Sequence, residues 1–127
     1  MSATFLDTHA VVWLYAGELK RFPAVSKRRL SKGELLISPA VLLEIQLLFE
    51  IGRLKVQGSE MIDDLEKRIS LRVCAQAFLA VASQALENSW TRDPFDRLIV
   101  AQSQLKRATL ITKDTTIHSH FRLAMWD

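Results

Sequence analysis

Residues 3–17, "ATFLDTHAVVWLYAG", indicate the fold of this chain at its amino-terminal end. Residues 3–7 are a short apolar run that ends in an acid, a pattern typical of a buried strand. Residues 9–17 follow as a helical segment, which Gly17 is expected to stop. A strand that leads directly into a helix is the first half of a β–α–β unit, so this stretch indicates an α/β fold.

The same alternation continues along the rest of the chain. We predict further strands at 34–38, 71–74, 108–114 and 122–127. Helices are predicted between them, at 22–32, 39–54, 59–69, 77–88 and 94–107. Such an alternation implies a parallel sheet of four to five strands with helices on both faces. The sequence has no internal repeat or linker, so residues 1–127 are expected to form a single domain.

The composition is that of a globular protein, with 49% hydrophobic and 24% charged residues. No apolar run approaches the roughly 20 residues that span a bilayer, and the amino terminus has no signal-peptide pattern. The lone Cys74 cannot form an internal disulfide and is expected to be buried, in a reducing compartment. These features favour a soluble, cytoplasmic protein with no membrane association.

The net charge of +3 is small, but basic residues gather between positions 20 and 32. Such a cluster is commonly a solvated helix face, and the alternative is a surface that binds phosphates. In the second case Arg28 and Arg29 would contact a nucleic-acid substrate.

Acidic residues follow two of the predicted strands and begin one of the predicted helices. Asp7 and Asp114 follow strands, and in open parallel sheets ligands bind beyond the carboxyl ends of the strands. In "TRDPFDRLIVAQ" (91–102), Asp93 is expected to cap the helix, with Pro94 in its first position. Asp96 comes one turn later and borders an apolar face, so a second role is open to it.

Glu44 lies on the inward face of the predicted helix 39–54. The apolar stripe there consists of Val41, Ile45, Leu48 and Ile51, and Glu44 falls on it at helical spacing. A carboxylate on a buried face must be paired, protonated or bound to a metal, because burying it alone is costly. The alternatives are a buried arginine partner or a place at the edge of the stripe.

Together, Asp7, Glu44, Asp96 and Asp114 can converge at one end of the sheet. Such a cluster would repel itself unless a cation neutralised it, and oxygen ligands select hard ions such as Mg²⁺ or Mn²⁺. A hard ion held by carboxylates near a basic surface suits hydrolysis of phosphodiester bonds.

Four stretches of the sequence resemble PIN-domain ribonucleases, and in particular the VapC-type toxins of bacterial toxin–antitoxin pairs. They are "FLDTH", "SPAVLLEI", "RDPFDRLIVAQ" and "LITKD", and the resemblance covers nearly the whole chain. It implies an α/β/α sandwich with Mg²⁺-dependent endoribonuclease activity. By this likeness Asp7 and Asp96 bind the metal directly, whereas Glu44 and Asp114 hold waters or a second ion. Thr8 and Thr112 are the accompanying hydroxyl residues.

The resemblance also implies partners: an RNA substrate, a second copy of the chain in a homodimer, and a cognate antitoxin that blocks the site. The apolar stretches "VVWLYAG" and "LLFEIGRL" could dock an antitoxin, or they could simply belong to the core. Arg97 and Lys113 lie beside acids, so they either contact phosphate or balance local charge. His118 and His120 are two residues apart without a third ligand, which argues against a zinc site.

Two other classes of function are open at this point. The first is a PIN fold that binds RNA or protein without cutting it. The second is a signalling receiver domain, but the strand at 34–38 ends in Ser38 where a receiver needs an aspartate, and Asp7 stands without an adjacent acid.

Overall fold

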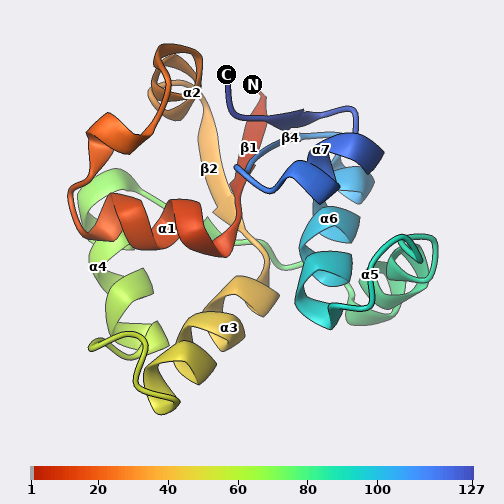
Figure 1. Ribbon diagram of the computed structural model, residues 1–127, viewed down its shortest axis with the longest axis horizontal. Helices are drawn as coiled ribbons and strands as arrows, with labels where there is room; N and C mark the ends of the chain where they lie inside the picture. Colours follow the sequence, from red (N-terminus) through yellow and green to blue (C-terminus); the bar gives the residue numbers. More distant parts are fainter. Residues whose placement is uncertain (1) are drawn as a thin grey trace.

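A computed structural model describes residues 2–127 and shows a five-stranded parallel sheet with helices packed against it (Figure 1). The strands are β1 (Ala3–Leu6), β2 (Glu34–Ile37), β3 (Arg72–Val73), β4 (Thr109–Ile111) and β5 (Ala124–Met125). Their order in the sheet is β3-β2-β1-β4-β5. Because β1 pairs in parallel with both β2 and β4, the segments that follow these three strands all leave the sheet at the carboxyl-terminal ends of the strands.

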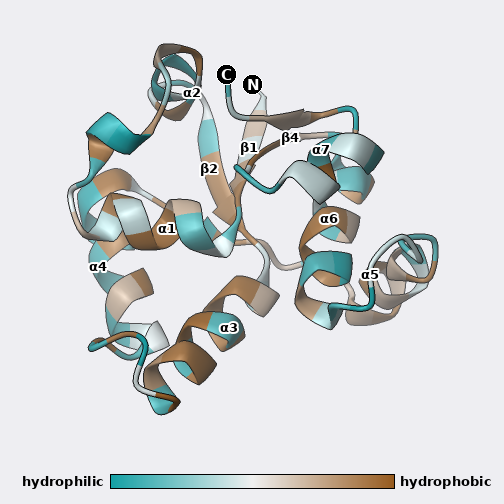
Figure 2. Ribbon diagram, in the orientation of Figure 1, coloured by the Kyte–Doolittle hydropathy of each residue, from teal (hydrophilic) through white to brown (hydrophobic). Residues whose placement is uncertain are grey.

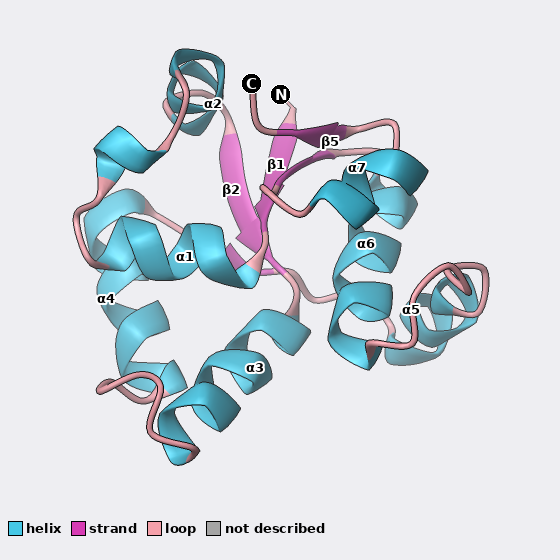
Figure 3. Cartoon of the chain, in the orientation of Figure 1, coloured by secondary structure: helices cyan, strands magenta, loops and turns pink. Residues whose placement is uncertain are grey.

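The helices form two layers, as Figure 3 shows with the strands between them. They are α1 (Thr8–Tyr15), α2 (Ala24–Leu30), α3 (Pro39–Glu50), α4 (Gly58–Ile69), α5 (Phe78–Ala85), α6 (Pro94–Lys106) and α7 (Thr115–His120), with a short 3₁₀ helix at Leu19–Arg21. In Figure 1, α1, α3 and α4 lie on one side of the sheet, and α5, α6 and α7 on the other. The predicted α/β/α sandwich is confirmed. The single-domain expectation for 1–127 stays a prediction, and residue 1 lies outside the described residues.

The core lies where the central strands pass between the two helix layers. Phe5, Leu6, Ile37, Leu110 and Ile111 are fully shielded from solvent. Figure 2 colours the carboxyl-terminal parts of β1 and β2 brown at this place, as expected for strands covered on both faces. The thiol of Cys74 is buried as predicted. Within residues 2–127, none of the helices is long and apolar enough to cross a membrane.

Helix α7 is absent from the sequence-based prediction. The predicted strand 108–114 ends at Ile111, and Asp114 caps α7 by accepting a hydrogen bond from the backbone N–H of Ile117 at 3.0 Å. A helix of a single turn or two carries too few apolar residues to show a period. The cap residue, an aspartate at the end of a strand, was the available signal.

Helix α3 ends at Glu50, four residues before the end of the predicted helix at Leu54. Gly52 has a φ of +82°, the left-handed conformation that closes many helices. As a result the last member of the predicted inward stripe, Ile51, is 68% exposed, and the prediction was wrong at that residue.

We expect Gly52→Ala to lower the free energy of unfolding by about 1 kcal/mol, because an alanine side chain is strained at positive φ. No atom lies within 4 Å of the added Cβ, so conformational strain is the only expected cost. Gly52→Asn is the matched control, since asparagine tolerates this conformation. Urea unfolding of both variants measures the difference, and equal losses would contradict a left-handed residue at this position.

Candidate active site

A cavity of about 580 Å³ lies beyond the carboxyl ends of β1 and β4. All four carboxylates that the sequence placed together line it: Asp7, Glu44, Asp96 and Asp114. The other lining residues are Thr8, His9, Trp13, Asp93, Ile99, Lys113, Thr115 and Thr116. The predicted convergence of the acids is therefore present, and their catalytic and metal-binding roles stay predictions.

Asp7 is held rigidly from three directions where β1 becomes α1. It caps α1, since its Oδ1 accepts a hydrogen bond from the backbone N–H of Ala10 at 3.1 Å. Its Oδ2 accepts one from the hydroxyl of Thr112, and its own N–H donates to the carbonyl of Ile111 at 3.1 Å. Burial raises the pKa of the Asp7 carboxyl, and the hydrogen bonds that it accepts from Thr112 and Ala10 oppose that shift.

Thr112 connects the acids that follow the two central strands. Its buried hydroxyl donates to Asp7 and accepts from the backbone N–H of Asp114 at 3.1 Å. The backbone carbonyl of Thr112 also lies 2.6 Å from Nε2 of His118. The hydroxyl that the resemblance identified is thus a fixed bridge between β4 and β1.

Glu44 is half-buried on α3, as its place on the apolar stripe predicted. Its partner is a hydroxyl, because Thr8 donates its side-chain O–H to Oε1 of Glu44. No basic side chain among residues 2–127 forms an ion pair with Glu44. The buried arginine considered as an alternative is therefore not found, and Glu44 faces the cavity with its negative charge unneutralised.

Asp93 and Asp96 divide the roles at the start of α6. Asp93 caps the helix, with Oδ1 accepting from the backbone N–H of Phe95 at 2.8 Å. Both side chains line the cavity, but neither carboxylate oxygen of Asp96 caps the helix. The pKa of Asp96 is raised from 3.8 to about 7, and burial is the largest cause. The negative charges of four neighbouring carboxylates raise it further; they are Asp93, Asp114, Glu44 and Asp7.

The oxygen-rich lining fits a hard divalent cation. In residues 2–127, no three aspartate, glutamate, histidine or cysteine side chains gather closely enough to enclose an ion as they stand. Mg²⁺ does not need such a cage, because it keeps several of its waters and is held by one or two carboxylates. The carboxylates around Asp96 repel one another, so a cation among them is favourable, and the oxygen donor set suits Mg²⁺ or Mn²⁺.

Of the predicted basic contacts, only Lys113 lines the cavity. Arg97 points elsewhere, since its Nε donates to the carbonyl of Thr91 at 2.8 Å and braces the loop before α6. Arg29 lies at the opposite, amino-terminal end of the strands, where its Nε donates to the hydroxyl of Thr4 at 2.7 Å. Arg28 is exposed on the same helix, α2. The structure does not bring these three arginines to the acids.

Arg29→Met is expected to lower the free energy of unfolding by about 1 kcal/mol, because it removes the hydrogen bond to the fully buried Thr4. Arg28→Met is the control and should change stability by less than about 0.5 kcal/mol. Urea unfolding checks both values. If Arg29→Met instead left stability unchanged and reduced the salt dependence of RNA binding, Arg29 would be a phosphate contact after all.

His9 and Trp13 line the cavity, although the sequence interpretation assigned neither to the site. They are four residues apart on α1, directly after Asp7, so they share one side of that helix. This spacing, counted from Asp7, could have indicated from the sequence that both rings lie beside the acids. His118 and His120 do not line the cavity: His118 contacts the backbone carbonyl of Thr112, and the ring of His120 stacks on Trp90, with centroids 4.9 Å apart.

Comparisons with known proteins agree with this fold. A model of the PIN domain matches residues 4–121. No curated protein matches. VapBC2 of Rickettsia felis, solved bound to promoter DNA, has a chain with a TM-score of 0.66 at 20% identity, covering 98% of this chain and 99% of that one. VapBC-1 of nontypeable Haemophilus influenzae gives 0.67 at 15% identity, with coverages of 98% and 96%. A chain of a toxin–antitoxin complex from Klebsiella pneumoniae has a TM-score of 0.62 at 18% identity, covering 93% of this chain and 92% of that one. The chain belongs to the PIN domain family.

Proposed function

We propose that this chain is a metal-dependent endoribonuclease that acts as the toxin of a toxin–antitoxin pair. The observation that carries the proposal is the cavity beyond β1 and β4, where Asp7, Glu44, Asp96 and Asp114 face one another with little neutralising charge. The likeness to chains of toxin–antitoxin complexes supports it. The match to the PIN family leaves no support for the receiver-domain alternative.

The acidic residues of the cavity have distinct roles in the proposed hydrolysis of RNA. When bound, Mg²⁺ or Mn²⁺ supplies a water of lowered pKa and positive charge against the scissile phosphate. Asp7 and Asp96 would hold the ion directly, while Glu44 and Asp114 would hold its waters. The hydrogen bonds from Thr112 to Asp7 and from Thr8 to Glu44 orient two of these carboxylates before substrate arrives.

Lys113 is the one lysine or arginine on the cavity lining within residues 2–127. Its ammonium group would contact a non-bridging phosphate oxygen and offset part of the charge of the acids around it. It thereby favours the dianionic, more strongly charged transition state over the substrate.

The direct test is cleavage of a mixed pool of structured RNAs by the purified protein, with Mg²⁺ or Mn²⁺ and with EDTA. We expect cutting with either metal and none with the chelator. Folded, antitoxin-free protein that cuts nothing while binding RNA would favour the non-catalytic PIN-fold module instead. Calorimetric titration with Mn²⁺ adds a readout that does not depend on the choice of RNA.

A cognate antitoxin fits a second surface of the chain. An apolar groove of about 380 Å³ lies between α1, α2 and α4, with Lys27 and Arg68 among its lining residues. An amphipathic helix with acidic residues on its flanks would match both the apolar and the basic parts of this groove. Trp13 instead packs against the core, and Phe49 is half-buried, so the stretches named from sequence supply only part of such a surface.

We further propose a homodimer in the cytoplasm. Phe78 and Leu79 of α5 are 71% and 79% exposed, and Leu43 of α3, which lines one apolar pocket together with Phe78, is 54% exposed. An apolar patch of this kind is suited to a second copy of the chain. Light scattering after size exclusion tests the dimer, and Phe78→Ser should convert it to a monomer.

A further inference from the structure

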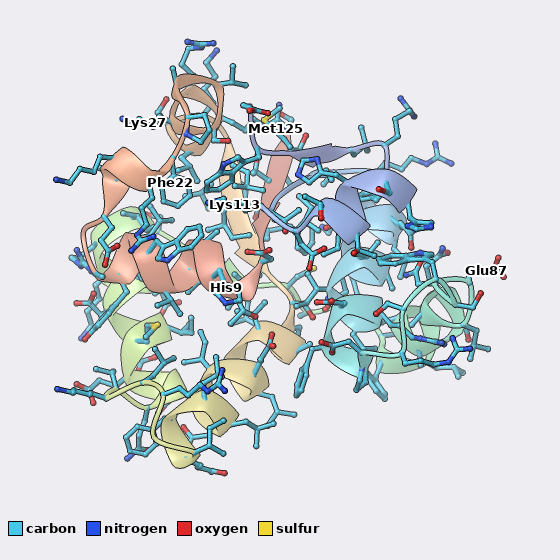
Figure 4. All side chains as sticks on the ribbon, in the orientation of Figure 1. His9, Phe22, Lys27, Glu87, Lys113 and Met125 are labelled. Atoms are coloured by element: carbon cyan, nitrogen blue, oxygen red, sulfur yellow. The ribbon has the colours of Figure 1, made fainter. Side chains whose placement is uncertain are left out.

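The wall of the cavity that is formed by α1 carries two rings beside the acids. His9 and Trp13 both line the cavity, and their ring centroids are 6.0 Å apart. His9 is exposed and Trp13 is half-buried. Figure 4 labels His9 at the amino-terminal end of α1 and Lys113, which lines the same cavity, beside that helix. We call these two side chains the α1 ring pair.

The indole of Trp13 is fixed in place by its neighbours. Phe22 meets it edge-on with centroids 6.1 Å apart, and Trp126 lies at 5.7 Å. The exposed guanidinium of Arg21 lies over the indole, 5.2 Å from its centroid, and is ion-paired with Glu18, so one planar group already packs against the ring. A ring that is already held in one orientation loses little conformational entropy when a ligand stacks on it.

The charge of the cavity limits how an RNA strand can be bound there. Among residues 2–127, five carboxylates line it, against the single ammonium group of Lys113. RNA phosphates are therefore repelled over most of the surface, and the cation that the acids hold offsets only part of this charge. Binding energy must come from the bases, and aromatic side chains provide it because every base has a face that can stack.

We propose that the α1 ring pair stacks an unpaired nucleobase next to the scissile phosphate and so positions the strand over the acids. This inference rests on the proposed ribonuclease function and adds to it the requirement for a single-stranded nucleotide at the cut. A base within a duplex is already stacked on its neighbours and cannot reach a ring in the protein without unpairing. Arg21, whose guanidinium lies over Trp13 and is ion-paired with the exposed Glu18, would exchange that pairing for the adjoining phosphate.

The test uses variants that keep or remove the ring at each position. Trp13→Leu and His9→Leu remove it, whereas Trp13→Phe and His9→Phe keep it; His9→Phe also removes the ring nitrogens of the imidazole. Trp90→Leu is the matched control, because Trp90 forms a second histidine–tryptophan pair, with His120, among residues that do not line the cavity. His9 is exposed, so its variants are informative even if Trp13→Leu disturbs packing.

Affinity is measured by the anisotropy of a short labelled RNA, as a single strand and annealed to its complement. Ca²⁺ replaces Mg²⁺, and a gel verifies that the RNA stays intact. We expect each leucine variant of the ring pair to weaken single-strand binding about tenfold. The phenylalanine variants and Trp90→Leu should stay within about threefold of the unaltered protein, which should prefer the single strand to the duplex.

The proposal is overturned if both leucine variants bind as tightly as the unaltered protein, or if the duplex binds as tightly as the single strand. It is also overturned if the phenylalanine variants lose as much affinity as the leucine variants. A cleavage assay with Mn²⁺ tests the proposed ribonuclease function separately from base stacking by the α1 ring pair. Ring-dependent binding without any cutting supports the ring pair and removes the nuclease, and cutting that ignores the ring pair does the reverse.

Discussion

Asp96→Asn and Asp7→Asn are each expected to lower metal-dependent RNA cleavage by about a hundredfold or more. Both side chains face the cavity, and both would lose the negative charge with which a carboxylate holds Mg²⁺ or Mn²⁺. Asparagine has nearly the same shape as aspartate, and it caps helices as well as aspartate does. Asp7→Asn should therefore keep the start of α1, and neither change should unfold the protein.

Asp93→Asn is the matched control for this experiment. Asp93 lies three residues before Asp96 and also lines the cavity, but its Oδ1 is engaged in capping α6. An asparagine can accept the same hydrogen bond, so cleavage should stay within about threefold of the unaltered protein. A dead Asp93→Asn variant beside an active Asp96→Asn variant would exchange the roles of the two aspartates. Initial rates on one RNA, at saturating Mn²⁺, give all three comparisons.

The acids could be located from the sequence because local patterns placed each of them on an element. Asp7 follows an apolar strand, Asp96 follows a cap and a proline, and Glu44 interrupts an apolar stripe. Because β1 and β4 are parallel neighbours, their carboxyl-terminal ends lie side by side. These inferences need only periodicity, capping and one topological rule, and so they survived errors of several residues in the element boundaries.

The predicted arginine contacts could not be located in this way, because a local sequence pattern does not indicate which polar acceptor an arginine side chain reaches. Arg29 and Thr4 are 25 positions apart, and nothing local to either residue indicates their hydrogen bond. Arg97 stands beside Asp96, yet its guanidinium turns back to the carbonyl of Thr91. A long, flexible side chain can reach many acceptors, so its neighbours in sequence are a poor guide to its neighbours in space.

The second large effect that we expect concerns stability. Without a divalent ion, Asp96→Asn should raise the free energy of unfolding by about 2 kcal/mol above pH 7 and leave it almost unchanged near pH 4. Burial and the surrounding carboxylates raise the pKa of Asp96 from 3.8 to about 7 in the folded protein. The folded state thus holds a proton that the unfolded state releases, and stability is lost as the pH rises from about 4 through 7.

The magnitude follows from the size of the pKa shift. A rise of about three units corresponds to about 4 kcal/mol between the two protonation states. The carboxyl retains contact with water in the cavity, and solvent screening reduces this to roughly half. An asparagine carries no charge at any pH, so its advantage over aspartate appears over the range in which Asp96 ionises.

Urea unfolding between pH 4 and pH 8, in EDTA, measures this difference. Glu87→Gln is the control, because Glu87 is exposed and lies far from the cavity, on the α5 side of the molecule (Figure 4). It should give no pH-dependent gain. Mg²⁺ should then stabilise the unaltered protein at pH 8 and stabilise Asp96→Asn much less, because the variant lacks one of the two carboxylates proposed to hold the ion directly. A gain that is the same at every pH would mean that repacking, and not the relief of charge repulsion, stabilises the variant.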